Sequence, residues 1–366
     1  MLSSLEKTQP ELYELFSKLL KEKSFPLVSL FSGPAYSGRM FAATSIAEEL
    51  GSDESSTIII SDREHKRIIA AAIELYRNNK TRRAAIFLKN TVSVMLREFN
   101  GAMLDSATGT AKKKFTEAGN CSELIAKLPD LDEKEVNSFC SSLEKSVSAI
   151  LGNKNSTGSI TVSQVRNIKS WCSTSSLEKR RKTVIIEGLE NALSSASNAL
   201  LKILEEPPQD TAFILISRSI SSIPPTILSR VRIFNFKIPD GRAINYILNS
   251  ISAPAGEFKD LEAFIWKFSG CDEALIEKCA FNLTHAKDFP VPDLIRELEK
   301  SQSWDRFFHL VLLNIGSLAD PDSTSYERIS YLYREIDRAV SQGDTFNQNM
   351  RLLLDFVIFR TREFIR

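Results

Sequence analysis

The stretch that most constrains the fold of this 366-residue chain lies at residues 196–231, ASNALLKILEEPPQDTAFILISRSISSIPPTILSRV. Its apolar residues first recur at the i, i+3 and i+4 spacing of a helix. Pro207 and Pro208 end that helix, because proline lacks the amide hydrogen and clashes with the preceding turn. Phe213–Ile216 follows as an all-apolar run, which is typical of a strand buried on both faces of a parallel sheet. This order predicts a layered α/β domain.

Three further apolar runs have the length of buried strands: Leu27–Phe31, Thr57–Ile60 and Thr183–Ile186. Segments with helical spacing separate them, first at residues 10–23 and again at 41–50. This alternation of strands and helices predicts a parallel, doubly wound sheet with helices on both faces.

The rest of the chain is predicted to be mainly helical. Residues 62–158 contain helix-like segments and a Ser-, Thr-, Gly- and Lys-rich stretch at 105–120, which we expect to be a loop. The last helix is expected at 347–364, with candidate core residues Met350, Leu353, Leu354, Phe356 and Val357. We expect three domains: an α/β domain at 1–238 with a helical insertion at 62–158, a small helical domain at 239–290 and a helical bundle at 291–366.

Composition narrows the class of protein. The chain has 47 basic and 46 acidic residues and a formal net charge of +1, so any contact with nucleic acid must come from a local patch. No apolar run approaches the roughly 18 residues of a membrane-spanning helix, and the N-terminus has no signal-peptide core, so we expect a cytoplasmic protein without a membrane partner. The five cysteines form no C-x-x-C pair, which predicts reduced, mostly buried thiols and no metal site.

Residues 32–40, SGPAYSGRM, stand between a predicted strand and a predicted helix. Gly33 and Gly38 have the spacing of the phosphate-binding loop G-x-x-x-x-G-K-[ST], in which the lysine contacts phosphates and the hydroxyl holds Mg²⁺. Arg39 replaces that lysine, and Met40 replaces the hydroxyl residue with a thioether, a poor ligand for Mg²⁺. Three alternatives stay open: a turn that binds nothing, retained ATP or ADP binding without hydrolysis, and true hydrolysis.

The order of NALLK at Asn198–Lys202, LEEPP, an apolar strand and then Ser229-Arg230 closely resembles the clamp-loader family of AAA+ proteins. The resemblance covers residues 10–60 and 160–240 well and the C-terminal part in outline. It implies an AAA+ P-loop-type sheet domain, a helical lid and a helical collar through which related subunits assemble. Many family members carry a four-cysteine zinc module in the first domain, and the insertion at 62–158 occupies its place.

In ATPases of this family, the strand before that helix ends in Asp-Glu, which organise Mg²⁺ and activate water. Here it ends in Glu187-Gly188, and glycine has no side chain to act as a base. The lid of active members supplies an arginine to the phosphates, where this chain has Asp272 and Glu273. Two acids there would repel phosphates, although they also suit the first turn of a helix. Ser217 matches the family's sensor position, and we expect its role to be structural.

Ser229-Arg230-Val231 corresponds to the Ser-Arg-Cys motif of the family, with valine in place of cysteine. By resemblance, Arg230 is an arginine finger that projects into the ATP site of a neighbouring subunit. The alternative is an internal ion pair at a strand end. Two basic runs, Lys112–Lys114 and Lys179–Lys182, are either solvated surface or contacts to duplex phosphates.

These substitutions predict a subunit that has lost its own hydrolysis and serves a neighbour. The resemblance implies a non-hydrolysing member of the bacterial DNA polymerase III clamp loader, which supports sliding-clamp loading during DNA replication. Its partners would be gamma/tau and delta subunits, the sliding clamp and primed DNA, with no cofactor bound productively and no zinc. Two alternatives stay open: an active gamma/tau-type ATPase that uses Arg39, and a scaffold without the finger function.

Overall fold

The computed structural model divides into two compact units, residues 1–265 and 266–366. The described residues are 2–61, 65–99, 109–151, 160–174, 181–189, 194–208, 210–258, 260–285, 287–301, 303–318, 326–345 and 350–365. No helix among them is both long and apolar enough to cross a membrane. The domain boundaries expected after residues 238 and 290 stay predictions.

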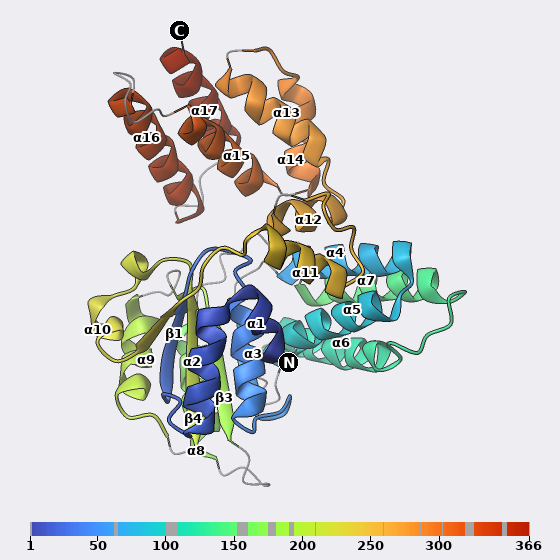
Figure 1. The fold of residues 1–366 in the computed structure, drawn as a ribbon, viewed down its shortest axis with the longest axis vertical. Helices are drawn as coiled ribbons and strands as arrows, with labels where there is room; N and C mark the ends of the chain where they lie inside the picture. The colour runs from blue at the N-terminus through green and yellow to red at the C-terminus, as the bar shows by residue number, and fades with distance from the viewer. Residues whose placement is uncertain are drawn as a thin grey trace. The chain divides into compact units, whose positions relative to one another are not determined.

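A five-stranded parallel sheet forms the centre of the first unit (Figure 1). In the order β2-β3-β4-β1-β5, its strands are β1 Val28–Ser32, β2 Thr57–Ile60, β3 Lys182–Glu187, β4 Thr211–Ser217 and β5 Arg232–Asn235. Every neighbouring pair is parallel, which confirms the predicted α/β fold and its four predicted strands. Strand β5 lies at the edge and is partly exposed, so its sequence lacks a continuous apolar run.

Successive residues of a strand point to opposite faces of the sheet, so these apolar strands place apolar side chains on both faces. Helices cover both of them. Leu30 and Phe213 belong to one apolar cluster, and Phe31 and Ile214 belong to the other. The first cluster is covered by α8 Val162–Ser173, α9 Ser194–Glu205 and α10 Pro225–Leu228. The second is covered by η1 Leu2–Ser4, α1 Leu5–Thr8, α2 Pro10–Lys21 and α3 Arg39–Glu49. Burial on both faces explains why these strands are apolar throughout.

The region predicted as a helical insertion contains α4 His65–Asn79, α5 Arg82–Leu96, α6 Gly109–Ala126 and α7 Val136–Leu151, with η2 Arg97–Phe99 after α5. The loop predicted at 105–120 is wrong where the structure describes it, because residues 109–120 belong to α6. Ala118, Cys121 and Ile125 of α6 are buried, and α6 packs on α5 and α7. This packing outweighs the weak helix propensity of the Gly- and Thr-rich stretch.

The chain after the sheet is helical, as predicted. The helices are α11 Gly241–Ser250, α12 Leu261–Phe268, α13 Glu273–Thr284, α14 Val291–Ser301, α15 Trp304–Ser317, α16 Tyr326–Thr345 and α17 Met350–Ile365. In the second unit, α13 to α17 pack around one apolar cluster. Leu353, Leu354 and Val357 are buried in it, and Met350 and Phe356 pack against it, which confirms the predicted core of the last helix.

Candidate functional site

The loop between β1 and α3, residues 33–38, has the backbone shape that its two glycines predict. Gly38 directly precedes α3 with φ +90°, a left-handed conformation that favours glycine. Gly33 has no room for a side chain, because a Cβ there would lie 2.5 Å from the carbonyl oxygen of Phe236. The Gly33 amide donates to the carbonyl oxygen of Ser217 at 3.2 Å, which ties the loop to the end of β4.

The two residues that replace the lysine and the hydroxyl residue begin α3. Arg39 is only 5% exposed, so its side chain lies within the protein at the start of the helix. Met40 packs against the apolar cluster that contains Phe16 and Phe31. The loop therefore keeps its glycines and a cationic residue, while the position of the metal-binding hydroxyl has joined the apolar core.

The predicted nucleotide-site residues meet at the carboxyl edge of the sheet. Ser32 aligns with Ser217 across β1 and β4, and Glu187 aligns with Ile216 across β3 and β4. Gly188 has φ +75°, and its amide donates to the carbonyl oxygen of Ile216 at 3.2 Å. The edge thus brings together the loop 33–38, Glu187 and Ser217, while Gly188 contributes only backbone.

Ser217 ends β4 and is 1% exposed. Its hydroxyl donates to the carbonyl oxygen of Ser219 at 3.0 Å and accepts from the Ser219 amide at 3.2 Å. These bonds satisfy the hydroxyl inside the turn that follows the strand, which favours the predicted structural role.

Gln9 is a site residue that the sequence analysis missed. Its side-chain amide donates from Nε2 to the carbonyl oxygens of Ser37, at 3.1 Å, and of Lys237, at 2.6 Å. It is 5% exposed and directly follows α1. Because 28 and 228 residues separate these partners from Gln9, no local sequence pattern could have indicated the contacts.

Arg230 lies between α10 and β5, and its side chain is 32% exposed. Nη2 donates to the carboxylate of Glu205, the last residue of α9, and forms an ion pair with it. Nη1 donates to the carbonyl oxygen of Thr226 at 2.5 Å and to Oγ of Ser229 at 3.1 Å. The internal ion pair that the sequence left open is therefore present. Glu205 was missed, although it belongs to the LEEPP motif.

Arg230 lies toward the amino ends of the parallel strands, and the loop 33–38 lies at their carboxyl ends. Arg232, the first residue of β5, aligns with Ser29 near the start of β1, whereas the loop begins after Ser32. A strand rises roughly 3.3 Å per residue, so about 10 Å of strand separates the level of Ser29 and Arg232 from the level of Ser32. The register thus places Arg230 and the loop of its own chain at opposite ends of the strands.

Asp272 and Glu273 have defined roles at the start of α13, in the second unit. Oδ1 of Asp272 accepts a hydrogen bond from the Leu275 amide at 3.1 Å and caps the helix. Glu273 pairs with Arg306 of α15, whose Nη2 lies 2.5 Å from Oε1. These contacts favour the helix-start interpretation of the two acids.

The two basic runs differ in exposure. Lys112 and Lys113 are exposed near the start of α6, and a contact of that run with duplex phosphates stays a prediction. Lys182 is 7% exposed, and its Nζ donates to the carbonyl oxygens of Trp171 and Thr174 at the end of α8, so it is not a surface cation. Lys179 and Arg180 lie outside the described residues. The five cysteines are buried without disulfides, as predicted. Within the described ranges, no three His, Cys, Asp or Glu side chains gather as a metal site.

Comparison with known proteins finds local similarity to subunits of DNA polymerase III. Residues 64–240 match the family described as DNA polymerase III, delta subunit. The chain is 37% identical over 94 residues to the DNA polymerase III subunit delta' of Haemophilus influenzae, covering 26% of this chain and 29% of that protein. It is also 37% identical over 90 residues to the DNA polymerase III subunit tau of Bacillus subtilis, covering 25% and 16%.

The chain spans less than a third of the length of the curated delta' subunits it matches. Among solved structures, a DNA polymerase III, gamma subunit-related protein from Thermotoga maritima is 15% identical, with 96% of this chain and 99% of that chain covered and a TM-score of 0.40. The fold assignment rests on the sheet topology of this chain.

Proposed function

We propose that this chain acts as a delta'-type clamp-loader subunit, because residues 64–240 match the DNA polymerase III, delta subunit family and shorter stretches resemble delta' and tau subunits. In this role it does not hydrolyse ATP itself. Arg230 is supplied in trans to the ATP site of a neighbouring subunit, where it stabilises charge on the transferring phosphoryl group.

The position of Arg230 is the observation that carries this proposal. It lies toward the amino ends of the strands, where it pairs with Glu205, whereas the loop 33–38 that would hold a nucleotide lies at their carboxyl ends. Nearly a third of the side chain is exposed, and three hydrogen bonds orient it. An oriented, partly exposed arginine at the opposite end of the strands from its own loop suits a site completed by a second subunit.

The residues at the carboxyl edge do not fit an ATP site that hydrolyses. Met40 lies against the apolar core, and Gly188 offers no carboxylate to activate water. No step of hydrolysis is therefore assigned to this chain. Binding of ATP or ADP without hydrolysis is tested by titrating the purified chain with labelled nucleotide.

The proposed role implies its partners. They are gamma/tau and delta subunits, the sliding clamp and primed DNA, in the cytoplasm of a bacterial cell. Residues 291–366, which contain α14 to α17, would form the collar domain that joins the chain to related subunits. Loading of the clamp would then couple to ATP hydrolysis at the neighbouring site.

The test is the ATPase rate of a clamp loader reconstituted with wild-type chain or with Arg230→Ala. We expect the variant to assemble and to lose most hydrolysis at one neighbouring site, since a finger supplied in trans contributes roughly 10³–10⁵ in rate. Arg232→Ala is the matched control, because Arg232 is an exposed arginine two residues away that packs over Phe234.

Each alternative predicts a different result. An unchanged ATPase rate in the Arg230→Ala complex would reject the finger and support the scaffold role, which the ion pair with Glu205 favours. ATP hydrolysis by the purified chain alone would instead support a gamma/tau-type ATPase that uses Arg39.

A further inference from the structure

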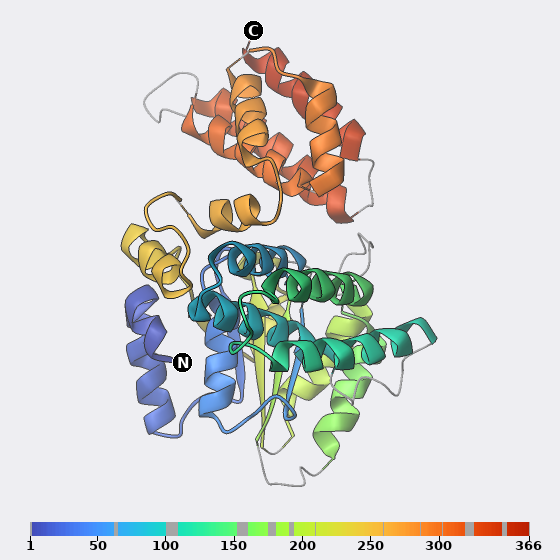
Figure 2. The same cartoon turned by 90° about the vertical axis from the view of Figure 1, so that its right-hand side faces the viewer.

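The N-terminal segment Leu2–Gln9 packs into the first unit against two helices near the candidate site (Figure 2). It contacts α3 through η1 and α11 through α1. Leu2 and Leu5 are 8% and 1% exposed, and both belong to the apolar cluster that includes Ala42 and Ile46 of α3. The segment is therefore anchored by apolar burial to the helix that follows the loop 33–38.

Gln9 ends this segment and joins two backbone regions through one side chain. Nε2 donates to Ser37 in the loop 33–38 and to Lys237 in residues 236–240, which we call the α11 linker because it leads into that helix. Oε1 accepts from the Lys237 amide at 3.3 Å. The amide thus uses its donors and its acceptor, and its burial limits competition from water.

The loop and the α11 linker also touch at a second point. The Phe236 amide donates to the carbonyl oxygen of Ser32 at 2.7 Å, and the Phe236 carbonyl oxygen leaves no room for a Cβ on Gly33. The first residue of the loop therefore contacts the first residue of the linker. Gln9 bridges the same two segments further along, at Ser37 and Lys237.

We propose that Leu2–Gln9 is a clasp that fixes the loop 33–38 to the α11 linker without nucleotide. In many nucleotide-driven proteins the bound phosphates order a loop and draw a lid toward it. Here hydrogen bonds and apolar burial within the chain make that connection permanently. The clasp goes beyond the arginine-finger function and does not depend on it.

Hydrogen exchange of the isolated full chain tests the clasp. Gln9→Met keeps the approximate length of the side chain and removes its hydrogen bonds. We expect amide exchange to accelerate together in residues 37–42 and 236–244, by about tenfold or more, because buried backbone groups lose their partner. Exchange in β4 should stay unchanged and shows that the sheet remains folded.

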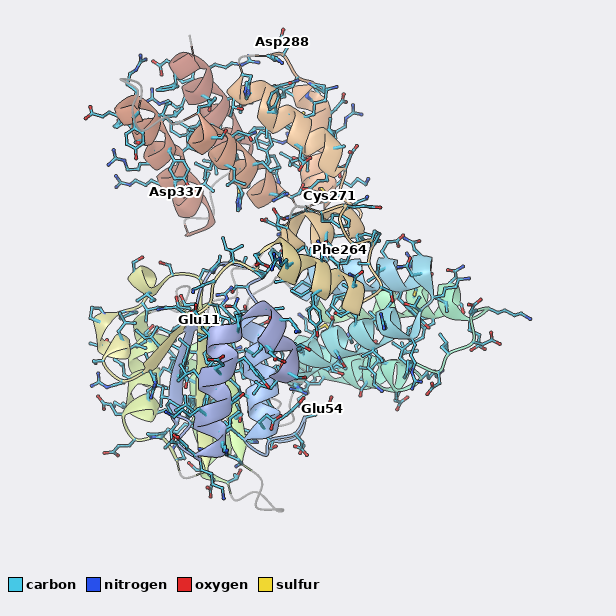
Figure 3. The ribbon with its side chains drawn as sticks, in the orientation of Figure 1. Glu11, Glu54, Phe264, Cys271, Asp288 and Asp337 are labelled. Carbon is cyan, nitrogen blue, oxygen red and sulfur yellow. The ribbon has the colours of Figure 1, made fainter. Side chains whose placement is uncertain are left out.

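Glu11→Ala is the matched control. Glu11, labelled in Figure 3, forms an ion pair at 2.8 Å with the Nζ atom of the same Lys237, but both side chains are more than 70% exposed. We expect little change in exchange for this variant. Acceleration in only one of the two segments after Gln9→Met, or an equal effect of Glu11→Ala, would overturn the proposal.

A second measurement uses the wild-type chain alone, so it holds even if a variant fails to fold. Addition of millimolar Mg²⁺ and ATP should leave exchange in the α11 linker unchanged, whether or not nucleotide binds at the loop 33–38. Protection of the α11 linker by ATP would show that nucleotide makes the connection, and would reject the clasp. Neither measurement includes a neighbouring subunit, so failure of the clasp and failure of the arginine finger are distinguishable.

Discussion

The buried ion pair between Glu273 and Arg306 should contribute strongly to the stability of the second unit. Arg306 is 1% exposed and donates from Nε and Nη2 to Oε1 of Glu273, at 3.0 and 2.5 Å. Arg306→Met removes the arginine that pairs with the Glu273 carboxylate. Removing one member of a buried pair typically costs about 3–5 kcal/mol, and we expect the unfolding free energy of this unit to fall by that amount.

Urea denaturation measures the effect. Small proteins have m-values of about 1–3 kcal/mol/M, so at about 2 kcal/mol/M a loss of about 4 kcal/mol lowers the midpoint by about 2 M. Trp304 is 8% exposed, lies two residues before Arg306 on α15 and reports the transition by fluorescence. Hydrogen exchange of α13 and α15 amides assigns that transition to the second unit.

Two further variants separate charge from packing. Glu273→Leu combined with Arg306→Met removes both charges, and it should recover most of the lost free energy because an apolar pair can replace a buried ion pair. Arg296→Met breaks an exposed pair with Asp293 and should cost less than about 1 kcal/mol. A loss below about 1 kcal/mol for Arg306→Met, or a double variant no more stable than the single one, would refute the reasoning.

Two other predictions concern the first unit. Burial raises the pKa of the Cys121, Cys140 and Cys172 thiols from 9.0 to about 11. The contribution of each thiol to the free energy of unfolding is therefore complete below pH 9, and up to about 3 kcal/mol of it is lost as the pH rises to 11. Burial lowers the pKa of Lys182, so deprotonation of this lysine favours folding as the pH rises; it is one group against three thiols. Urea unfolding under reducing conditions at pH 8 and 10.5 measures the net effect, and we expect a lower free energy of unfolding at pH 10.5. Equal free energies of unfolding at the two pH values would contradict the prediction. Gly33→Ala should lower the melting temperature more than Gly38→Ala, because only at Gly33 does a Cβ meet backbone atoms; the reverse order would disprove that account.

The sheet was predictable because its strands are buried on both faces. A strand such as Phe213–Ile216 is apolar on both faces, so it stands out in the sequence as a continuous apolar run. Pro207 and Pro208 mark where the preceding helix ends. Strand β5 and helix α6 were harder for the opposite reason. The side chains of β5 are partly exposed, and α6 is stabilised by packing on α5 and α7 rather than by its own sequence.

The contacts around the candidate site were predictable only in part. The glycine spacing and the replacements at Arg39, Met40 and Gly188 follow from local pattern. Gln9 and Glu205 do not, because Lys237 lies 228 residues from Gln9 and Arg230 lies 25 residues from Glu205. Only the folded chain shows that Gln9 joins Ser37 of the loop 33–38 to Lys237.

The ion pair of Arg230 with Glu205 is compatible with the proposed arginine-finger role, because the ion pair contributes much less free energy than an arginine finger contributes to the transition state. The side chains are 32% and 48% exposed, and an exposed ion pair contributes about 0.2–1 kcal/mol. A finger that contributes roughly 10³–10⁵ in rate supplies about 4–7 kcal/mol to the transition state. A neighbour's phosphates can therefore take the guanidinium from Glu205 at small cost. In the reconstituted loader, Glu205→Gln should keep the ATPase rate within about fivefold of wild type, because the lost pair is worth at most about 1 kcal/mol. A loss as large as that of Arg230→Ala would mean that the neighbouring site requires the ion pair itself.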